Sequence, residues 1–583
     1  MMREMLGLFC LGLLATVLVG CTQFTPYRTI TLGHDQTRER NVIAQEVACY
    51  SGRPVGELKP CAHKDGASAG AYAVQHRHYQ FTDYRGDTDK TGELKPADYH
   101  MSFVEFDDQG WFADRKQMEA LFATLHRLEA DEKRRGNSGH LLLLLYAHGW
   151  KHNASQCDDN VICFSRLLER MDILEQKLQP RKMRRRVVGI YVGWRGLSLD
   201  AGVLSNITFW TRKAAAARVG QGGVTELLTR LNAYRSSRNQ ERDGDKTQLV
   251  ITGHSFGGQV IYSALSHALM ERGGRTIRAA NAKNCDDIDE SRVSPDGLNC
   301  YSTATSFGDL VVLVNPAFEG SQYEPLFHIA TNRCYRANQR PVMMTVTSSG
   351  DWATRIVFPL GRKTSTLFER ARSDEQQESI LRTVGHAERY ETHRLEWLGP
   401  PVKFGEEPDS AREEGDCGCP YLEPTAQFNW RRFKGRVESF LLPFQARPEE
   451  NPLRAQRENN RRLYDTVYGP NVRLNGDMKY SANFPYLVVK ADKEIIEDHN
   501  TIYSEPFVRF LHSFFLVHIA NGRPFESDGC IKGKEIEFCP LDGLVPCEQS
   551  CRLADGRSCS GRNTEDLKGE IEPPIRVGVT KTR

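Results

Sequence analysis

Ser255 lies in a stretch of the chain that suits a nucleophile for attack on a carbonyl carbon. Residues 249–251 form a short apolar, β-branched run, followed by Thr-Gly-His-Ser-Phe-Gly-Gly over 252–258 and then by a helical pattern of apolar residues. A strand, a tight turn with glycines on both sides of a serine, and a helix are the context that a Gly-x-Ser-x-Gly nucleophile turn requires. Because glycine lacks a Cβ atom, the strand and the helix can approach closely on either side of the serine. We therefore predict that Ser255 is the nucleophile of an acyl transfer.

The elements that would position this serine alternate between strands and helices along the chain. Apolar runs predict strands over 101–106, 141–145, 187–192, 310–314, 342–346 and 486–490. Helical spacing of apolar residues predicts helices over 115–133, 161–178 and 207–234. The run over 141–145 is continuously apolar, which is typical of a parallel strand buried on both faces. The alternation predicts an α/β fold with a mostly parallel, doubly wound sheet flanked by helices.

With these elements, the chain resembles a known superfamily. The segment Gly253 to Gly257, the sequence His-Gly-Trp at 148–150 after a predicted strand, and the two strands that follow the serine are similar to the α/β-hydrolases. Within that superfamily the chain looks like the lipid-anchored bacterial esterases and lipases. The resemblance covers residues 100–360 and 480–520. It implies the α/β-hydrolase fold and a triad in the chain order serine, acid, histidine.

The resemblance also implies where the oxyanion donors lie. In this superfamily one donor is the backbone N–H after the nucleophile and the other comes from a loop upstream of it, so we expect Phe256 and Trp150 to supply them. His148 and His152 flank the second position. We expect them to order the loop rather than to bind a metal, because no carboxylate or thiolate stands at ligand spacing beside them.

Candidates for the acid and the histidine follow from their positions after predicted strands. Asp351 comes after the strand over 342–346 and is the expected acid, and Glu319, after the preceding strand, is the alternative. His499 follows the last predicted strand and precedes an amphipathic helix, which is the superfamily's arrangement. The alternatives for the histidine are His393 and His386.

The choice of His499 divides the chain into segments. The hydrolase core is expected over 99–360 and again over 481–520, where the last strand, the histidine loop and the closing helix lie. Residues 361–480 are charge-rich and contain prolines, and they are expected to form a large insertion or lid before the last strand. Residues 22–98 are expected to be a tether and an irregular N-terminal region, and 521–583 a Cys-rich tail.

The first 21 residues resemble the signal peptide of bacterial lipoproteins. Arg3 is followed by an apolar segment over 6–19 that is too short to span a bilayer, and the segment ends in Leu-Val-Gly-Cys at 18–21. In that family the chain is cut before the cysteine and the thiol is lipid-modified, so Cys21 is the expected lipid attachment site. Thr22 rather than Asp follows it, which favours the outer membrane.

The sixteen cysteines and the net charge of +2 bear on whether the chain has disulfides, a metal site or a nucleic-acid surface. Without Cys10 and Cys21 an even number of cysteines is left, which in an exported chain indicates disulfides, and Cys157 and Cys163 are close enough in sequence to pair. The tail cysteines lack paired C-x-x-C spacing, so we expect no metal. Near-neutral charge gives no support for a nucleic-acid surface.

Together these features predict a serine hydrolase that cleaves carboxylic esters, as an esterase or lipase, at the cell envelope. A Ser-His-Asp triad needs no cofactor. The expected partners are an ester substrate, including lipid esters, and the membrane that holds the lipid anchor, with no nucleic acid. A peptidase or thioesterase would share the triad. The alternative from another class is a lipid-anchored binding or scaffold protein on an inactive α/β-hydrolase frame, because a fold does not fix a function.

Overall fold

The computed structural model of the chain describes residues 26–28, 79–81, 99–155, 158–178, 184–196, 209–239, 247–274, 304–331, 335, 339–400, 419, 422, 471–476, 484–516, 518, 529–532 and 535–538. The predicted signal segment with Cys21 and most of the cysteines of the tail lie outside these residues. The tail contributes a short antiparallel pair, β11 (Gly529–Lys532) and β12 (Glu535–Phe538).

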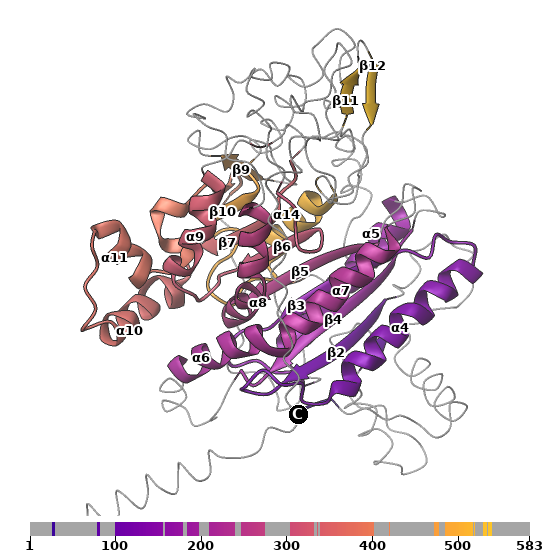
Figure 1. The fold of residues 1–583 in the computed structure, drawn as a ribbon, viewed down its shortest axis with the longest axis horizontal. Coiled ribbons are helices and arrows are strands. Elements are labelled where there is room, and N and C mark those ends of the chain that lie inside the picture. The colour runs from indigo at the N-terminus through magenta and orange to yellow at the C-terminus, as the bar shows by residue number, and fades with distance from the viewer. Residues whose placement is uncertain are drawn as a thin grey trace, which may run out of the picture.

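A ten-stranded mixed sheet forms the centre of the described chain (Figure 1). Its strand order is β1-β2-β4-β3-β5-β6-β7-β10-β8-β9. All neighbouring pairs from β2 to β8 are parallel, and the edge strands β1 and β9 pair antiparallel. In chain order the strands are β1 (Tyr79–Phe81), β2 (His100–Phe106), β3 (Leu141–Ala147), β4 (Arg186–Trp194), β5 (Gln248–His254), β6 (Leu310–Val314), β7 (Met343–Ser348), β8 (His393–Trp397), β9 (Val472–Gly476) and β10 (Tyr486–Ala491).

Helices cover both faces of this sheet, so the coarse α/β prediction is confirmed. One face packs against α4 (Arg115–Arg134), α6 (Phe209–Val219), α7 (Thr225–Arg238), α8 (Phe256–Gly274) and α9 (Gly320–Thr331). The other packs against α5 (Asp159–Leu178) and α14 (Glu505–Phe515). Shorter helical segments are η3 (Gly220–Val224), η5 (Ala353–Val357), α10 (Phe358–Ser365), α11 (Asp374–Leu381), η6 (Val384–His386) and η7 (Glu388–Tyr390).

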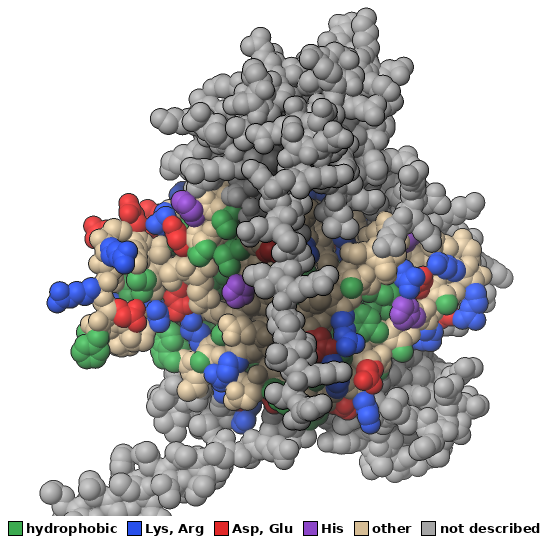
Figure 2. Space-filling model, viewed as in Figure 1, with side chains coloured by type: hydrophobic (Ala, Val, Ile, Leu, Met, Phe, Trp, Pro, Cys, Tyr) green, Lys and Arg blue, Asp and Glu red, His purple; other side chains and the backbone are tan. Residues whose placement is uncertain are grey.

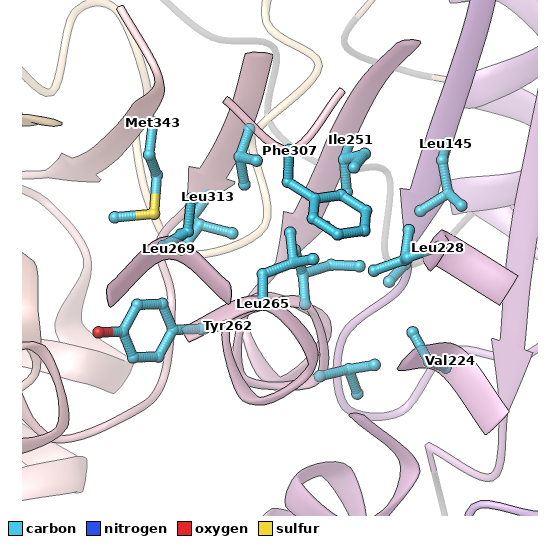
Figure 3. Packing of buried hydrophobic residues seen from close by; sticks show 14 of the residues in the cluster. Leu145, Val224, Leu228, Ile251, Tyr262, Leu265, Leu269, Phe307, Leu313 and Met343 are labelled. Atoms are coloured by element: carbon cyan, nitrogen blue, oxygen red, sulfur yellow. The ribbon is translucent and has the colours of Figure 1, made fainter. Parts of the chain in front are cut away.

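Strand β3 shows why the centre of the sheet is stable. Leu143 and Leu145 belong to the apolar cluster under α7 and α8, whereas Leu142 and Leu144 belong to the cluster under α5, because successive side chains of a strand point to opposite faces. In the first cluster, Leu145 lies near apolar side chains of β5 and β6 and of the two helices (Figure 3). Each fully buried leucine contributes about 1.5–3 kcal/mol through the hydrophobic effect.

The order of the strands also locates a crevice. From β3 the chain crosses to β4 on one side, whereas from β5 it continues to β6 on the other side. Connections that leave two adjacent parallel strands in opposite directions open a crevice at the carboxyl ends of those strands, where ligands of open α/β sheets bind. The segments 148–153 and 255–256 follow β3 and β5 at this point.

Two strands within the predicted insertion, residues 361–480, join the sheet. Strand β8 pairs parallel with β10, and β9 pairs antiparallel with β8, so this segment extends the sheet beyond β10. Only Leu395 of β8 and Val472 and Leu474 of β9 are buried apolar residues. Strands with so few buried apolar residues carry a weak apolar signal, and for that reason the sequence did not indicate them.

The N-terminal region also contacts the core more closely than the sequence indicated. Strand β1 pairs antiparallel with β2. Further upstream, the backbone N–H groups of Tyr27 and Arg28 donate to the Glu105 carboxylate of β2 at 2.9 and 2.8 Å. The Arg28 side chain is 1% exposed. Part of the predicted tether is therefore packed against the sheet.

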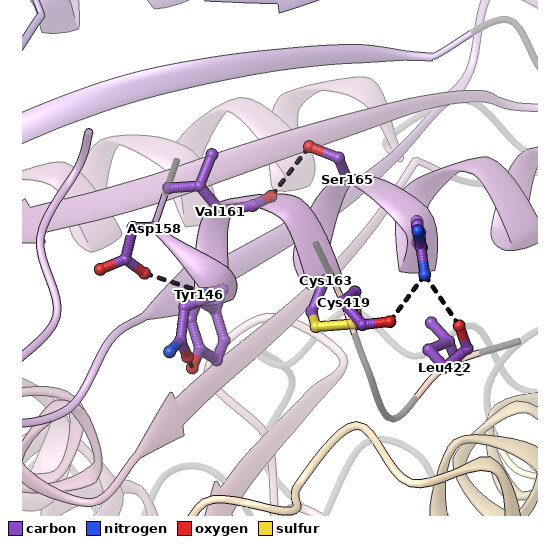
Figure 4. Close-up of a disulfide and its surroundings, with 9 residues drawn as sticks. Tyr146, Asp158, Val161, Cys163, Ser165, Cys419 and Leu422 are labelled. Carbon is purple, nitrogen blue, oxygen red and sulfur yellow. Dashed lines mark hydrogen bonds between the residues drawn. A yellow bond between two sulfur atoms is a disulfide. The ribbon is translucent and has the colours of Figure 1, made fainter. Parts of the chain in front are cut away.

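A disulfide joins two distant segments and corrects the predicted pairing. Cys163 of α5 is bonded to Cys419, and not to Cys157, which lies outside the described residues (Figure 4). Arg166, one turn after Cys163, donates from Nη1 to the carbonyl oxygens of Cys419 and Leu422 at 2.7 and 3.0 Å. The pairing depends on where residue 419 lies in space, which the spacing of cysteines along the chain does not show.

On the face shown in Figure 2, Lys and Arg side chains are interspersed with Asp and Glu side chains, so this face is mixed in charge. No helix among the described residues combines the length and the apolar composition needed to cross a membrane.

Candidate active site

The backbone at Ser255 has the strained conformation of a nucleophile turn. Its φ is 54°, in the left-handed region that residues other than glycine rarely adopt. The Ser255 N–H donates to the carbonyl of Val314 at 3.0 Å, so the turn is fixed against the end of β6. A Cβ atom at Gly257 would lie 2.0 Å from the carbonyl oxygen of Ala147, so only glycine fits there. Strain of this kind persists where the surrounding structure enforces it, as at functional sites.

His499 contacts both Ser255 and an acid. Its Nε2 atom lies 2.8 Å from Ser255 Oγ, and its Nδ1 atom lies 2.9 Å from Asp351 Oδ2. These three residues are far apart in sequence and follow β5, β7 and β10, whose parallel carboxyl ends lie along one edge of the sheet. With Nδ1–H donating to the carboxylate, Nε2 presents its lone pair to the serine hydroxyl.

Asp351 is held as a carboxylate. Its side chain is fully buried, and burial alone would raise its pKa, but the attraction of His499 and hydrogen bonds from His499 and Thr354 lower the pKa well below its usual value. The Thr354 N–H donates to Oδ1 at 3.0 Å, and the Thr354 hydroxyl donates to Oδ2. Burial also lowers the pKa of His499, but the Asp351 carboxylate reverses this effect and raises it above 6.5. A buried carboxylate beside the imidazole stabilises the protonated form of the histidine.

Two residues that the sequence did not single out hold the loop that carries His499. The amide of Asn315, after β6, donates to the backbone carbonyl oxygens of Asp498 and His499 at 3.1 and 2.9 Å. The Nε2 atom of His254 lies 2.8 Å from the same His499 carbonyl, so it carries the proton and donates. Burial and the neighbouring His499 lower the pKa of His254, so this ring is neutral. The position of Asn315 directly after a predicted strand was a signal that could have identified it.

The two expected oxyanion donors lie on either side of the serine. Phe256 is the first residue of α8, and the first N–H groups of a helix have no acceptor within that helix. On the other side, a Cβ atom at Gly149 would lie 2.9 Å from the Cβ of Ser255, so the backbone before Trp150 is in contact with the serine. The Trp150 ring packs edge-on against Phe209, which in turn contacts Phe256. An apolar wall therefore borders the site.

His148 and His152 are engaged within the loop after β3. His148 Nδ1 donates to the carbonyl of Gly149 at 2.9 Å, and Nε2 accepts from the Trp194 N–H at 3.1 Å. Complete burial lowers the pKa of His148 to about 4. His152 Nδ1 lies 3.2 Å from Asp158. Both rings have partners that order the loop.

The alternative acid and histidines have other partners. The Glu319 carboxylate pairs with Lys213 at 2.9 Å and with Arg362 at 3.0 Å. His393, at the start of β8, contacts Thr392 Oγ1 through Nδ1 at 2.8 Å. His386 lies behind Asp351 and contacts Thr354 rather than Ser255. Of the candidates, the structure brings Asp351 and His499 to Ser255.

No group of three or more His, Cys, Asp or Glu side chains within the described part of the chain has a metal-binding arrangement.

Comparison with family models, with curated proteins and with solved structures gave no match to this chain. The fold and the geometry of the site therefore define its class as an α/β protein with a Ser-His-Asp constellation at the carboxyl edge of a mostly parallel sheet.

Proposed function

We propose that the chain is a serine hydrolase of the α/β-hydrolase superfamily that cleaves carboxylic esters. The single observation that carries this proposal is the continuous contact from Ser255 Oγ through the His499 ring to the Asp351 carboxylate. A serine hydroxyl is a weak nucleophile unless a base accepts its proton, and this arrangement supplies the base together with the carboxylate that orients it.

The reaction would proceed in two acyl transfers. Ser255 Oγ bonds to the ester carbonyl carbon while its proton passes to His499 Nε2, and the Trp150 and Phe256 N–H groups stabilise the oxyanion. The carbon–oxygen bond to the alcohol then breaks, and the departing alkoxide takes the proton from His499. Water next attacks the acyl-enzyme and gives its proton to His499, and Ser255 leaves with that proton as the acid is released.

Labelling by a fluorophosphonate tests this function directly. The wild-type chain should be labelled and should hydrolyse p-nitrophenyl esters, and Ser255→Ala should abolish both. His499→Ala should also abolish hydrolysis, whereas His393→Ala should keep most of it because His393 contacts Thr392 instead of the serine. A wild-type protein that is neither labelled nor faster than Ser255→Ala on any ester would exclude the proposal and favour the scaffold alternative.

The membrane is part of the same proposal, with Cys21 as the lipid-bearing residue. Tyr27 lies six residues after Cys21, and the N–H of Tyr27 is bound to Glu105, one residue before β2 ends. Six residues span at most about 22 Å when fully extended. A lipid on Cys21 would therefore hold the carboxyl edge of the sheet, where Ser255 lies, close to the bilayer.

Exposed apolar side chains support this orientation. Trp111, Trp352 and Leu398 are 75%, 61% and 49% exposed, and each lies within a few residues of the carboxyl end of β2, β7 or β8. Ile356 and Leu360 continue the exposed row of Trp352 along η5 and α10 at four-residue spacing. Exposed aromatic and aliphatic side chains on one edge suit insertion into a lipid surface, so we propose that the substrate is an ester within the membrane.

A further inference from the structure

A chain of hydrogen bonds continues behind Asp351, on the side away from the serine. Thr354 Oγ1 contacts Asp351 Oδ2 and also lies 3.0 Å from His386 Nε2. His386 Nδ1 lies 2.7 Å from Lys490 Nζ. These residues come from η5, η6 and β10, so three separate elements meet behind one carboxylate.

The direction of each hydrogen bond follows from the groups present. An ionised Asp351 only accepts, so the Thr354 hydroxyl donates to it. The Thr354 oxygen then accepts from His386, which requires the proton on Nε2. His386 is neutral in this tautomer, and its Nδ1 lone pair accepts from the Lys490 ammonium. Every donor in the chain therefore points from the cation towards the carboxylate.

Packing protects the two members of this hydrogen-bond chain nearest Asp351 from water. His386 is 6% exposed and Thr354 is 2% exposed. A Cβ atom at Gly385 would lie 1.8 Å from Thr347 Oγ1, so glycine at that position allows η6 to lie directly on β7. In such a low-dielectric environment a hydrogen bond to a charged group is stronger than in water.

The charges around Lys490 and His386 are mixed. Burial lowers the pKa of Lys490 to about 8, while Glu391 and Asp351 attract the ammonium and Arg355 and Arg382 repel it. Burial and the ammonium of Lys490 lower the pKa of His386 to about 3, so its ring stays neutral over the working range of a hydrolase.

We propose that Thr354, His386 and Lys490 are positioning residues that orient the Asp351 carboxylate and keep it ionised behind His499. This inference rests on the proposed hydrolase function for its effect on rate. The hydroxyl of Thr354 occupies one side of Oδ2 and leaves the other for His499, so the carboxylate cannot rotate away from the imidazole. Without these hydrogen bonds, Asp351 would be a buried carboxylate with fewer partners, and burying such a charge costs free energy.

Steady-state kinetics on a p-nitrophenyl ester test the two nearer links. Thr354→Val, which removes the donor to Asp351, should lower kcat about tenfold, the size expected for a hydrogen bond to a charged group, with KM little changed. Thr354→Ser keeps the hydroxyl and should restore most of kcat. His386→Gln keeps an N–H donor for Thr354 and should retain more kcat than His386→Phe. Equal kcat values for Thr354→Val and Thr354→Ser would overturn the inference.

The pH profile tests the lysine. Lys490→Met removes a positive charge near the triad, so protonated His499 is repelled less and its pKa rises. The acid limb of kcat/KM should then shift to higher pH by on the order of half a unit. Lys493→Met is the matched control, since it removes an exposed lysine from the loop after β10 and should leave the limb in place. If the acid limb lies at the same pH in Lys490→Met as in Lys493→Met, the proposed role of Lys490 is excluded.

A measurement without turnover separates this inference from the hydrolase proposal. In ¹⁵N-histidine-labelled protein at pH 7, NMR should show His386 as the neutral Nε2–H tautomer. If the protein shows this tautomer but does not react with a fluorophosphonate, the result supports the hydrogen-bond chain and contradicts the proposed hydrolase function. If His386 is protonated, or is the Nδ1–H tautomer, the inferred hydrogen-bond chain is excluded even if the enzyme is active.

Discussion

The side-chain amide of Asn315 donates to the backbone carbonyl of His499 at 2.9 Å, although the two residues are 184 positions apart. The same side chain accepts from the Ser348 N–H at 2.9 Å through Oδ1. One buried amide thus connects the carboxyl end of β6 with that of β7 and with the loop that carries the histidine. The orientation of the imidazole depends on this connection because the loop has no secondary structure of its own at His499.

Asn315→Asp should lower kcat by tenfold or more with little change in KM. The new carboxylate is close in shape to the amide, but it would present an acceptor to the two carbonyl oxygens that now receive donors, and a buried group without its partner costs about 1–3 kcal/mol. Esterase kinetics and thermal melting would be measured together. Asn239→Asp is the control, because Asn239 makes a similar pair of bonds to the backbone of Thr247 at the opposite end of β5. It should affect melting alone, and a loss of kcat in both variants would argue against a specific role for Asn315.

Activity should depend on the ionisation of His499. Only the neutral ring can accept the Ser255 proton, and the Asp351 carboxylate raises the pKa of His499 above 6.5. The acid limb of kcat/KM, which reports the free enzyme, should therefore lie above pH 6.5, with activity lost as pH falls through it. Asp351→Asn removes the charge that raises this pKa, and it should lower kcat by about 10⁴, as in other triads of this kind. A limb well below pH 6.5 in the wild-type chain would contradict the assignment of His499 as the base.

Removal of the disulfide between Cys163 and Cys419 should destabilise the protein. The bond closes a loop of 256 residues, and cross-links of native proteins typically contribute about 2–4 kcal/mol, mainly through the unfolded state. Cys163→Ser should thus lower the denaturation midpoint under oxidising conditions. Cys157→Ser is the control, because the sequence alone suggested that Cys157 pairs with Cys163. An equal decrease of the midpoint in both variants would favour the local pairing, because either substitution would then break the same disulfide.

The exposed row Trp352, Ile356 and Leu360 should contribute to membrane binding. A triple substitution to serine removes apolar surface that a bilayer would otherwise cover, and it should weaken co-sedimentation of a chain lacking residues 1–21 with vesicles that contain anionic lipids. Arg355 and Lys363, which lie on the same helical segments, would favour the anionic composition. Ser255→Ala should bind like the wild type, because Ser255 is buried. Binding unaffected by the triple substitution would exclude this surface.

Local sequence patterns were sufficient for the elements nearest the nucleophile. A five-residue apolar run predicted β6 with its observed bounds, and the runs before Trp150 and Ser255 correctly predicted β3 and β5. These strands are buried on both faces, so their composition is almost entirely apolar and the signal is strong. Strands β8 and β9 escaped prediction because few of their side chains are both apolar and buried, so their composition resembles that of loops.

By itself, the sequence determined the α/β architecture and the position of Ser255 in a turn between a strand and a helix, because burial periodicity and glycine spacing are local properties. It left the histidine open among His386, His393 and His499. Only the tertiary structure decided which of these lies 2.8 Å from Ser255 Oγ, and only it brought Thr354, His386 and Lys490 together behind Asp351. Such contacts join residues from different strands, and the packing of the whole sheet, rather than any local pattern, determines which side chains meet at its edge.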